Sequence, residues 1–252
     1  MRRSCLLLVL FLAAGLSACA STGYLRYRVS PDIEVIQVSP HAWVHVSYAE
    51  IPGFGRVGSN GLVFVVNNEA LLFDTPFTDG QTKELVDWIR TKLGARVTGF
   101  VPNHSHGDCM GGLAWLHANG VASYADNRTI RLARAAGTPV PQHGFDGTLT
   151  LKLGMEEVVC RWFGAAHSPD NIVVWLPGES ILFAGCMVKE TAAQSIGNTV
   201  GADLVAWPGT VTRVAAAYRD ARIVIPGHGA FGGTELLGHT IDLVRRSAPA
   251  RH

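Results

Sequence analysis

The sequence predicts an α/β fold in which two mixed sheets pack face to face and helices cover their outer sides. In each half of the chain, short apolar hairpin segments come first and strand–helix units follow. Sheets built in this order bury one face against each other and the other face under helices. No low-complexity linker or short-period repeat divides the chain, and its 48% hydrophobic content can fill one large core. A single layered domain is therefore expected.

Composition excludes several classes of protein. The 252 residues carry a formal net charge of +1, without the basic excess of a nucleic-acid-binding protein. The five cysteines are an odd number and far too few for a disulfide scaffold. At least one thiol therefore has no disulfide partner, which points to a metal or catalytic use.

The first half of the chain predicts two hairpins followed by strand–helix units. Thr78 and Gln81 form a capping box at the start of an amphipathic helix, and residues 51–55 form a mobile hairpin tip rich in glycine. Strands are expected at 33–38, 42–46, 62–66, 70–73, 97–102 and 121–124, and helices at 78–93, 113–119 and 127–136.

The second half repeats the same order. Strands are expected at 148–153, 157–163, 171–176, 181–183 and 222–226, and helices near 208–219 and 234–246. The two halves then supply one sheet each.

The N-terminus is typical of an export signal. Two arginines precede an apolar run at 5–14, which is too short to span a membrane. The segment Leu16-Ser17-Ala18-Cys19 resembles the bacterial lipobox, so we expect a signal peptide at 1–18, a lipidated Cys19, a tether at 19–31 and one domain at 32–252. Cleavage after Ala20 is the alternative. Both cases place the protein in the oxidising periplasm, and lipidation would anchor it to the outer membrane.

A histidine-rich segment follows the strand expected at 97–102. His104 and His106 are two residues apart, and Asp108 follows two residues later. Imidazoles at this spacing can converge on one ion, and the carboxylate can reach a neighbouring ion. Histidines that only hydrogen-bond within the loop, with Asp108 capping a turn, are the alternative.

Three later residues favour a metal site. His167, Cys186 and His228 each follow a predicted strand and have small neighbours. Side chains in this position gather along one edge of a layered α/β domain. One such residue would usually be structural, but four such segments together favour ligands.

With these residues in place, the sequence resembles the class B, subclass 1 metallo-β-lactamases, from Ile33 to about Val244. The hairpin around Pro52-Gly53-Phe54-Gly55 and Ser59-Asn60-Gly61 is similar to that of a lipoprotein member of this family. The resemblance implies an αβ/βα four-layer sandwich that binds two Zn²⁺ ions. It assigns one zinc to His104, His106 and His167, and the other to Asp108, Cys186 and His228.

Other hydrolases of the wider superfamily, which act on thioesters, lactones or phosphodiesters, remain an alternative. They typically continue the HxHxD motif with another histidine and have aspartate where this chain has Cys186. Here Cys109 occupies the position of that histidine. A non-catalytic lipoprotein that binds zinc is a further alternative, although closed structural zinc sites usually have four protein ligands rather than three.

The resemblance also implies roles for residues around the zinc ions. Asp108 would orient the attacking hydroxide, Lys189 would bind the substrate carboxylate, and Asn198 would donate to the substrate carbonyl. Asp74 would lie beneath the metal loop. The residues alone leave Phe54 ambiguous, but an apolar hairpin tip is costly to expose, which favours Phe54 as a cover over the bound substrate. The expected reaction is hydrolysis of penicillins, cephalosporins and carbapenems by a monomer that meets the membrane only through Cys19.

The remaining candidates are expected to be structural. Cys109 is expected to be a packed thiol, Cys160 a core residue and Trp43 a core side chain, while Phe77 stays ambiguous. Six histidines have no motif around them: His41, His45, His117, His143, His239 and His252.

Overall fold

A computed structural model describes residues 23–247, and their strands form two sheets. The first sheet has the order β1-β2-β3-β4-β5-β6-β7-β8, and the second has the order β13-β12-β11-β10-β9. The expected signal peptide and Cys19 lie outside the described residues. The first-half elements are β1 (Arg26–Ser30), β2 (Ile33–Gln37), β3 (Ala42–Ile51), β4 (Gly55–Val66), β5 (Glu69–Phe73), α1 (Asp79–Lys92), β6 (Arg96–Val101), α2 (Gly107–Met110), α3 (Leu113–Ala118), β7 (Ala122–Asp126) and α4 (Asn127–Ala136).

The second half begins with the last strand of the first sheet and then forms the second sheet. In the second sheet, β9 to β12 pair with one another antiparallel, and β13 pairs with β12 in parallel. The elements are β8 (His143–Phe145), β9 (Thr148–Leu153), β10 (Glu156–Trp162), β11 (Ile172–Leu176), the 3₁₀ turn η1 (Pro177–Glu179), β12 (Ile181–Gly185), α5 (Trp207–Ala217), β13 (Ile223–Pro226) and α6 (Glu235–Ser247).

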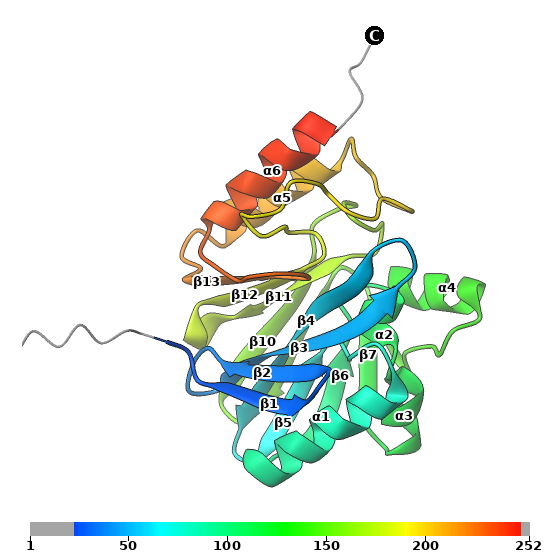
Figure 1. Ribbon diagram of the computed structural model, residues 1–252, viewed down its shortest axis with the longest axis vertical. Helices are drawn as coiled ribbons and strands as arrows, with labels where there is room; N and C mark the ends of the chain where they lie inside the picture. The colour runs from blue at the N-terminus through cyan, green and yellow to red at the C-terminus, as the bar shows by residue number, and fades with distance from the viewer. Residues whose placement is uncertain (1–22, 248–252) are drawn as a thin grey trace, which may run out of the picture.

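The elements form four layers, as Figure 1 shows: α5 and α6 lie on one side, α1 and α3 on the other, and the two sheets lie between them. Three clusters of buried apolar side chains fill the interfaces between adjacent layers. Phe64 and Phe183 belong to the cluster between the sheets, Leu85 and Leu113 to the one under α1 and α3, and Val211 to the one under α5 and α6. The predicted αβ/βα sandwich is therefore confirmed.

Local signals account for most of the element boundaries. At the start of α1, the Thr78 hydroxyl accepts a hydrogen bond from the Gln81 N–H at 3.2 Å, as the capping box predicts. The Gln81 side chain does not complete the box, since its Oε1 has no hydrogen-bond partner among the described residues, while its amide N–H donates to the Tyr48 carbonyl at 2.8 Å. The helix is thereby tied to the β3–β4 hairpin.

One expectation about the first half is wrong in part. The tether expected at 19–31 is not a tether throughout, since residues 26–30 form β1 and pair with β2. The sequence did not indicate this strand, because Arg26 and Tyr27 are exposed and an edge strand can form without a buried apolar pattern. The hairpin tip expected at 51–55 is present, since β3 and β4 pair up to Ile51 and Gly55 and the chain turns between these two residues. The short elements α2 and β8 were not predicted.

Candidate metal centre

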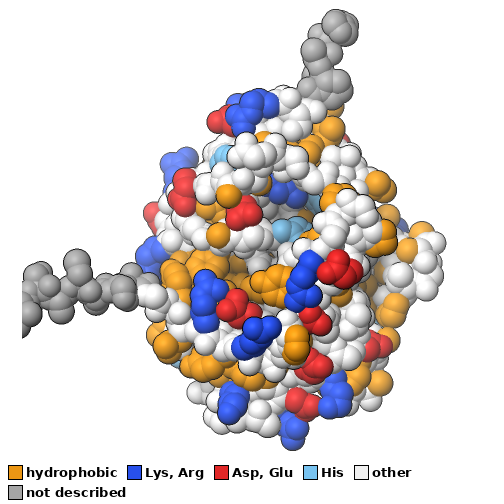
Figure 2. Space-filling model, viewed as in Figure 1, with side chains coloured by type: hydrophobic (Ala, Val, Ile, Leu, Met, Phe, Trp, Pro, Cys, Tyr) orange, Lys and Arg blue, Asp and Glu red, His pale blue; other side chains and the backbone are white. Residues whose placement is uncertain are grey.

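The six residues that the sequence singled out meet at one end of the two sheets. His104 and His106 follow β6, and Asp108 lies in the first turn of α2. His167 follows β10, Cys186 comes directly after β12, and His228 lies two residues after β13. Figure 2 shows histidine side chains inside a hollow on one face of the molecule, next to a Lys or Arg side chain and hydrophobic ones. Strand ends of both sheets thus bring together side chains that are far apart in the sequence.

The three histidines His104, His106 and His167 form the first group, which we call the histidine triad. His104 Nε2 lies 2.9 Å from His106 Nδ1, and His167 Nε2 lies 3.3 Å from the same atom. Nitrogen ligands of a tetrahedral zinc ion are about 3.3 Å apart, given Zn–N bonds of roughly 2.0–2.1 Å. The nitrogen atoms therefore have the spacing of one metal's ligands.

Burial keeps two rings of this triad in the neutral form that metals bind. It lowers the pKa of His167 to about 2, with the charges of His104 and Lys189 acting in the same direction. Burial also lowers the pKa of His106. The ring of His104 has its other nitrogen, Nδ1, 3.2 Å from Cys109 Sγ. A proton on Nδ1 can thus point to sulfur and leave Nε2 free as a ligand.

Asp108, Cys186 and His228 form the second group, the mixed triad. Asp108 Oδ2 lies 3.2 Å from His228 Nε2 and 3.6 Å from Cys186 Sγ. Cys186 Sγ lies 3.4 Å from His228 Nε2. Around a tetrahedral zinc ion, sulfur and oxygen or nitrogen ligands are about 3.5 Å apart. This donor set also fits one ion.

Electrostatics favour the anionic forms of two members of the mixed triad. The neighbouring Cys109 thiol is the largest cause that lowers the pKa of Cys186 well below its usual value, against the effect of burial. Burial alone would raise the pKa of Asp108, but the hydrogen bond from His228 and the nearby histidine charges hold it well below its usual value. The same two anions, against the effect of burial, raise the pKa of His228 well above its usual value, so its Nε2 proton must leave when a metal binds. The thiolate, carboxylate and imidazole that result are suitable ligands for Zn²⁺.

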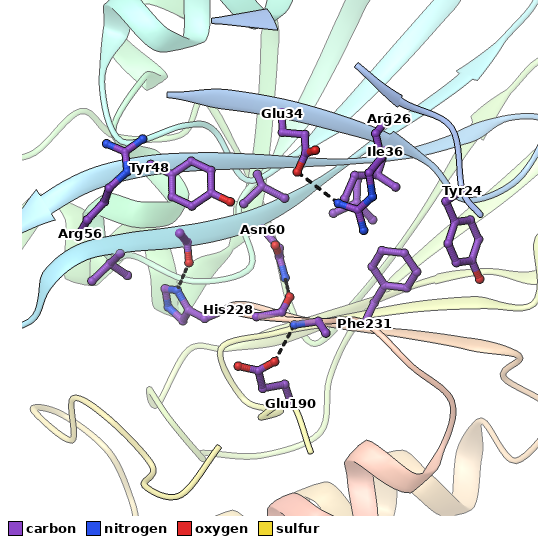
Figure 3. Close-up of a pocket in the computed structure, with 16 residues that line it drawn as sticks. Tyr24, Arg26, Glu34, Ile36, Tyr48, Arg56, Asn60, Glu190, His228 and Phe231 are labelled. Carbon is purple, nitrogen blue, oxygen red and sulfur yellow. Dashed lines mark hydrogen bonds and ion pairs between the residues drawn. The ribbon is translucent and has the colours of Figure 1, made fainter. Parts of the chain in front are cut away.

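Polar side chains that the sequence did not single out hold these loops in place. Asn60 is buried in β4 and donates to the Gly229 carbonyl at 2.8 Å (Figure 3) and to the Pro226 carbonyl at 2.9 Å, on either side of His228. His228 Nδ1 donates to the Gly58 carbonyl at 2.8 Å, which leaves Nε2 to face the mixed triad. These contacts join residues about 170 positions apart, so no local pattern could reveal them.

Two buried aspartates support the loop of the histidine triad. Asp74, expected beneath this loop, accepts the Asn103 N–H and adopts a positive φ of 58°. Asp170 accepts the Ser105 N–H at 2.9 Å and the Ser168 hydroxyl, so it links the loop to the segment of His167. Burial is the main cause that raises the pKa of Asp74 well above its usual value.

A cavity of about 590 Å³ opens above the two triads. Phe54 lines it from the hairpin tip with 60% of its surface exposed, and Phe77 lines it as well. Lys189 reaches it from a buried position, and Asn198 from the loop before α5. The side-chain oxygen of Asn198, Oδ1, accepts the Val200 N–H at 3.0 Å, so the hydrogens of the side-chain NH₂ group stay available to a ligand. The structure thus places the three expected substrate-binding residues around one cavity.

A second cavity, of about 700 Å³, lies behind the β3–β4 hairpin and shares Val57, Glu190 and His228 with the first. Figure 3 shows two of its charged groups paired: Arg26 with Glu34 at 3.2 Å, and Glu190 with the Ala230 N–H at 2.8 Å. A third, Arg56, pairs with Asp32 at 2.8 Å. No cluster of convergent, unpaired polar groups marks this cavity among the described residues, so it is not a second candidate site.

The other candidates lie outside the two triads, as expected. Cys160 and Trp43 are buried in the core, and Cys109 is a buried thiol that contacts His104 of the histidine triad and also Asp108 and Cys186 of the mixed triad. His41 pairs with Glu179, His117 with Ser123, His239 with the Ala193 carbonyl, and His143 stacks on Tyr124, while His45 is buried beside Asp74 and His252 lies outside the described residues.

No family model matches the chain, but individual proteins do. It is 50% identical over 219 residues to a type 2 metallo-β-lactamase of Bacteroides fragilis, which covers 87% of this chain and 88% of that protein. A type 2 metallo-β-lactamase of Bacillus cereus is 34% identical over 213 residues, or 84% of this chain and 83% of the relative.

Solved structures agree with these relatives. A metallo-β-lactamase from Pontibacter korlensis superposes with a TM-score of 0.82 at 36% identity, over 84% of this chain and 99% of its own. The DIM-1 metallo-β-lactamase also gives a TM-score of 0.82 at 36% identity, over 86% and 99% of the chains. Within residues 23–247, no helix has the length and apolarity needed to cross a membrane. The chain belongs to the metallo-β-lactamases, the zinc-dependent enzymes that hydrolyse β-lactam antibiotics and thereby confer resistance.

Proposed function

We propose that this enzyme is a subclass 1 member that works with two Zn²⁺ ions, one held by the histidine triad and one by the mixed triad. The observation that carries this proposal is the pair of three-donor groups, each with ligand-like spacing, below one cavity. Three protein donors per ion leave a coordination position open, as in catalytic rather than structural zinc sites.

When bound, zinc lowers the pKa of a water molecule to about 7 and polarises a carbonyl group. The protein then has to place the substrate. The Lys189 ammonium attracts the carboxylate that β-lactam antibiotics carry, and the Asn198 amide donates to the β-lactam carbonyl. Asp108 orients the nucleophile from below, while Phe54 covers apolar groups of the antibiotic and excludes water.

We propose penicillins, cephalosporins and carbapenems as substrates, since the cavity is open and its walls are largely apolar. The purified protein should consume a carbapenem and a chromogenic cephalosporin, lose both activities to a chelator, and regain them with Zn²⁺ but not Mg²⁺. Ultraviolet absorbance follows both reactions. A zinc-loaded protein that opens the cephalosporin but not the carbapenem would contradict the proposed range, and one that opens neither would contradict the function.

Lys189→Ala should raise KM more than it lowers kcat, because the ammonium contacts a carboxylate that does not react. An exposed charge contact is weak, but Lys189 is only 9% exposed, so we expect KM to rise about tenfold. Lys189→Arg keeps the charge and is the matched control. A fall in kcat with an unchanged KM would contradict this role.

We further propose that the enzyme is exported to the periplasm and anchored through a lipid on Cys19, with all site residues supplied by one monomer. The lipobox-like segment supports this, and β1 starts at Arg26, so the tether before the domain is short. Cys19→Ser should move the protein from the membrane fraction to the soluble periplasmic fraction. Continued membrane association would contradict the anchor, and a mature N-terminus at Ser21 would indicate cleavage after Ala20.

A further inference from the structure

Trp207 lies between two functional groups of the site, although nothing in the sequence singled it out. It is the first residue of α5, and its side chain is fully buried. The indole Nε1 donates to the Met187 carbonyl at 2.8 Å, in the segment between Cys186 and Lys189. The hydrogen bond therefore fixes the orientation of the indole ring in addition to the packing around it.

One face of this indole contacts the proposed carboxylate-binding lysine. Lys189 Nζ lies 5.6 Å from the centroid of the Trp207 ring, within the range of a cation–π contact. The main chain of Lys189 is held separately, since its N–H donates to the Thr240 hydroxyl at 2.8 Å. The backbone of Lys189 is thus fixed by α6, and the indole contact orients its ammonium group.

The same indole contacts a member of the histidine triad. The rings of Trp207 and His167 lie 5.8 Å apart with an interplanar angle of 67°, an edge-to-face arrangement. His167 Nδ1 is buried and has no hydrogen-bond partner among the described residues. By contrast, His104 and His228 have Cys109 and the Gly58 carbonyl as partners of their second nitrogens. The orientation of the His167 ring therefore depends on packing.

The start of α5 is also tied to the segment of His167. The Asp203 N–H donates to the Ala166 carbonyl at 2.8 Å, and the Trp207 N–H donates to the Asp203 carbonyl at 2.9 Å. Indole and imidazole are thus connected through both side chains and backbone. Replacing the indole should therefore change the orientation of the His167 ring.

We propose that Trp207 is a positioning residue that sets the Lys189 ammonium for the substrate carboxylate and the His167 ring for the metal. The lysine part rests on the function proposed above. The indole contacts neither the substrate nor the ion and acts through its two neighbours. One aromatic side chain thereby serves substrate binding and metal binding together.

A double-mutant cycle tests the lysine part. Trp207→Leu removes the ring and should raise KM for a cephalosporin about tenfold, while Trp207→Phe keeps a π face and should stay within about threefold of the parent. In a Lys189→Ala background, Trp207→Leu should change KM less than about twofold, because the group it positions is gone. Loss of packing alone would give effects that multiply, and that result would overturn the inference.

Competition for Zn²⁺ with a chromophoric chelator tests the histidine part without using activity. Trp207→Leu should release one of the two ions at a chelator concentration about tenfold lower than the parent requires. Trp175→Leu is the matched control, since Trp175 packs on Tyr218 under α5 but lies outside both triads. If Lys189→Ala alone leaves KM unchanged, the role proposed for the lysine is wrong. The zinc competition then decides: unchanged affinity in Trp207→Leu, or an equal loss in Trp175→Leu, overturns the inference.

Discussion

Replacing Cys186 with Ser should leave one tightly bound zinc ion instead of two and lower kcat/KM at least about a hundredfold. The thiol lies 3.6 Å from Asp108 Oδ2 and 3.4 Å from His228 Nε2, so it supplies one corner of the mixed triad. A serine hydroxyl is shorter and stays protonated at neutral pH, whereas zinc binds the deprotonated sulfur strongly. The histidine triad is unchanged and should keep its ion.

Metal analysis after dialysis against buffered zinc measures this directly, with hydrolysis measured on the same samples. Cys160→Ser is the matched control, because Cys160 is a buried free thiol in β10 that belongs to the core between the sheets. The control can lose some stability but should keep two ions. Two ions bound to Cys186→Ser with parental affinity would show that another group completes the mixed triad.

The candidate site could be predicted from the sequence because its key residues sit in short local patterns. Strand, turn and ligand follow one another at His167, Cys186 and His228, and the spacing of His104, His106 and Asp108 is local too. Alternation and glycine positions likewise gave most strands and helices. The resemblance then supplied which residues share an ion, which spacing alone left open.

What could not be predicted depends on contacts between distant segments. Asn60 holds the turn of His228 from a strand in the other half of the chain. Asp170 accepts a hydrogen bond from the Ser105 N–H, and Trp207, at the start of α5, contacts the ring of His167. An asparagine in a strand or a tryptophan at a helix start has no local signal for such a role. The edge strand β1 was not predicted for a related reason: its pairing with β2 defines it, and its residues show no buried pattern.

Acid should destabilise the metal-free protein by about 3 kcal/mol through His45 alone. His45 is 1% exposed, and burial lowers its pKa to about 4, with only a partial opposing effect of its hydrogen bond to the Asp74 backbone. In the unfolded chain its pKa is about 6.5. Below that pH the unfolded state binds the extra proton first, so stability present above pH 6.5 is lost progressively down to about pH 4.

His45→Gln should remove this part of the acid sensitivity. The ring Nε2 lies 3.0 Å from the Asp74 carbonyl, and a glutamine amide can donate to the same oxygen without titrating. The replacement must not be larger, because even a Cβ on Gly61 would lie 2.1 Å from the His45 ring. Both proteins should be compared by urea unfolding without zinc, at pH 7 and pH 4.

Comparing the two pH values separates the effect of His45 protonation on stability from the effect of the lost ring packing. Loss of ring packing lowers the stability of His45→Gln equally at both pH values, and the other buried histidines titrate alike in both proteins, so both contributions cancel. What remains should be a decrease between pH 7 and pH 4 that is smaller in the variant by about 3 kcal/mol. Equal decreases would mean that His45 accepts its proton in the folded state without penalty. Its unpartnered Nδ1 would then need a buried water or a shift of the chain around Asp74 to receive it.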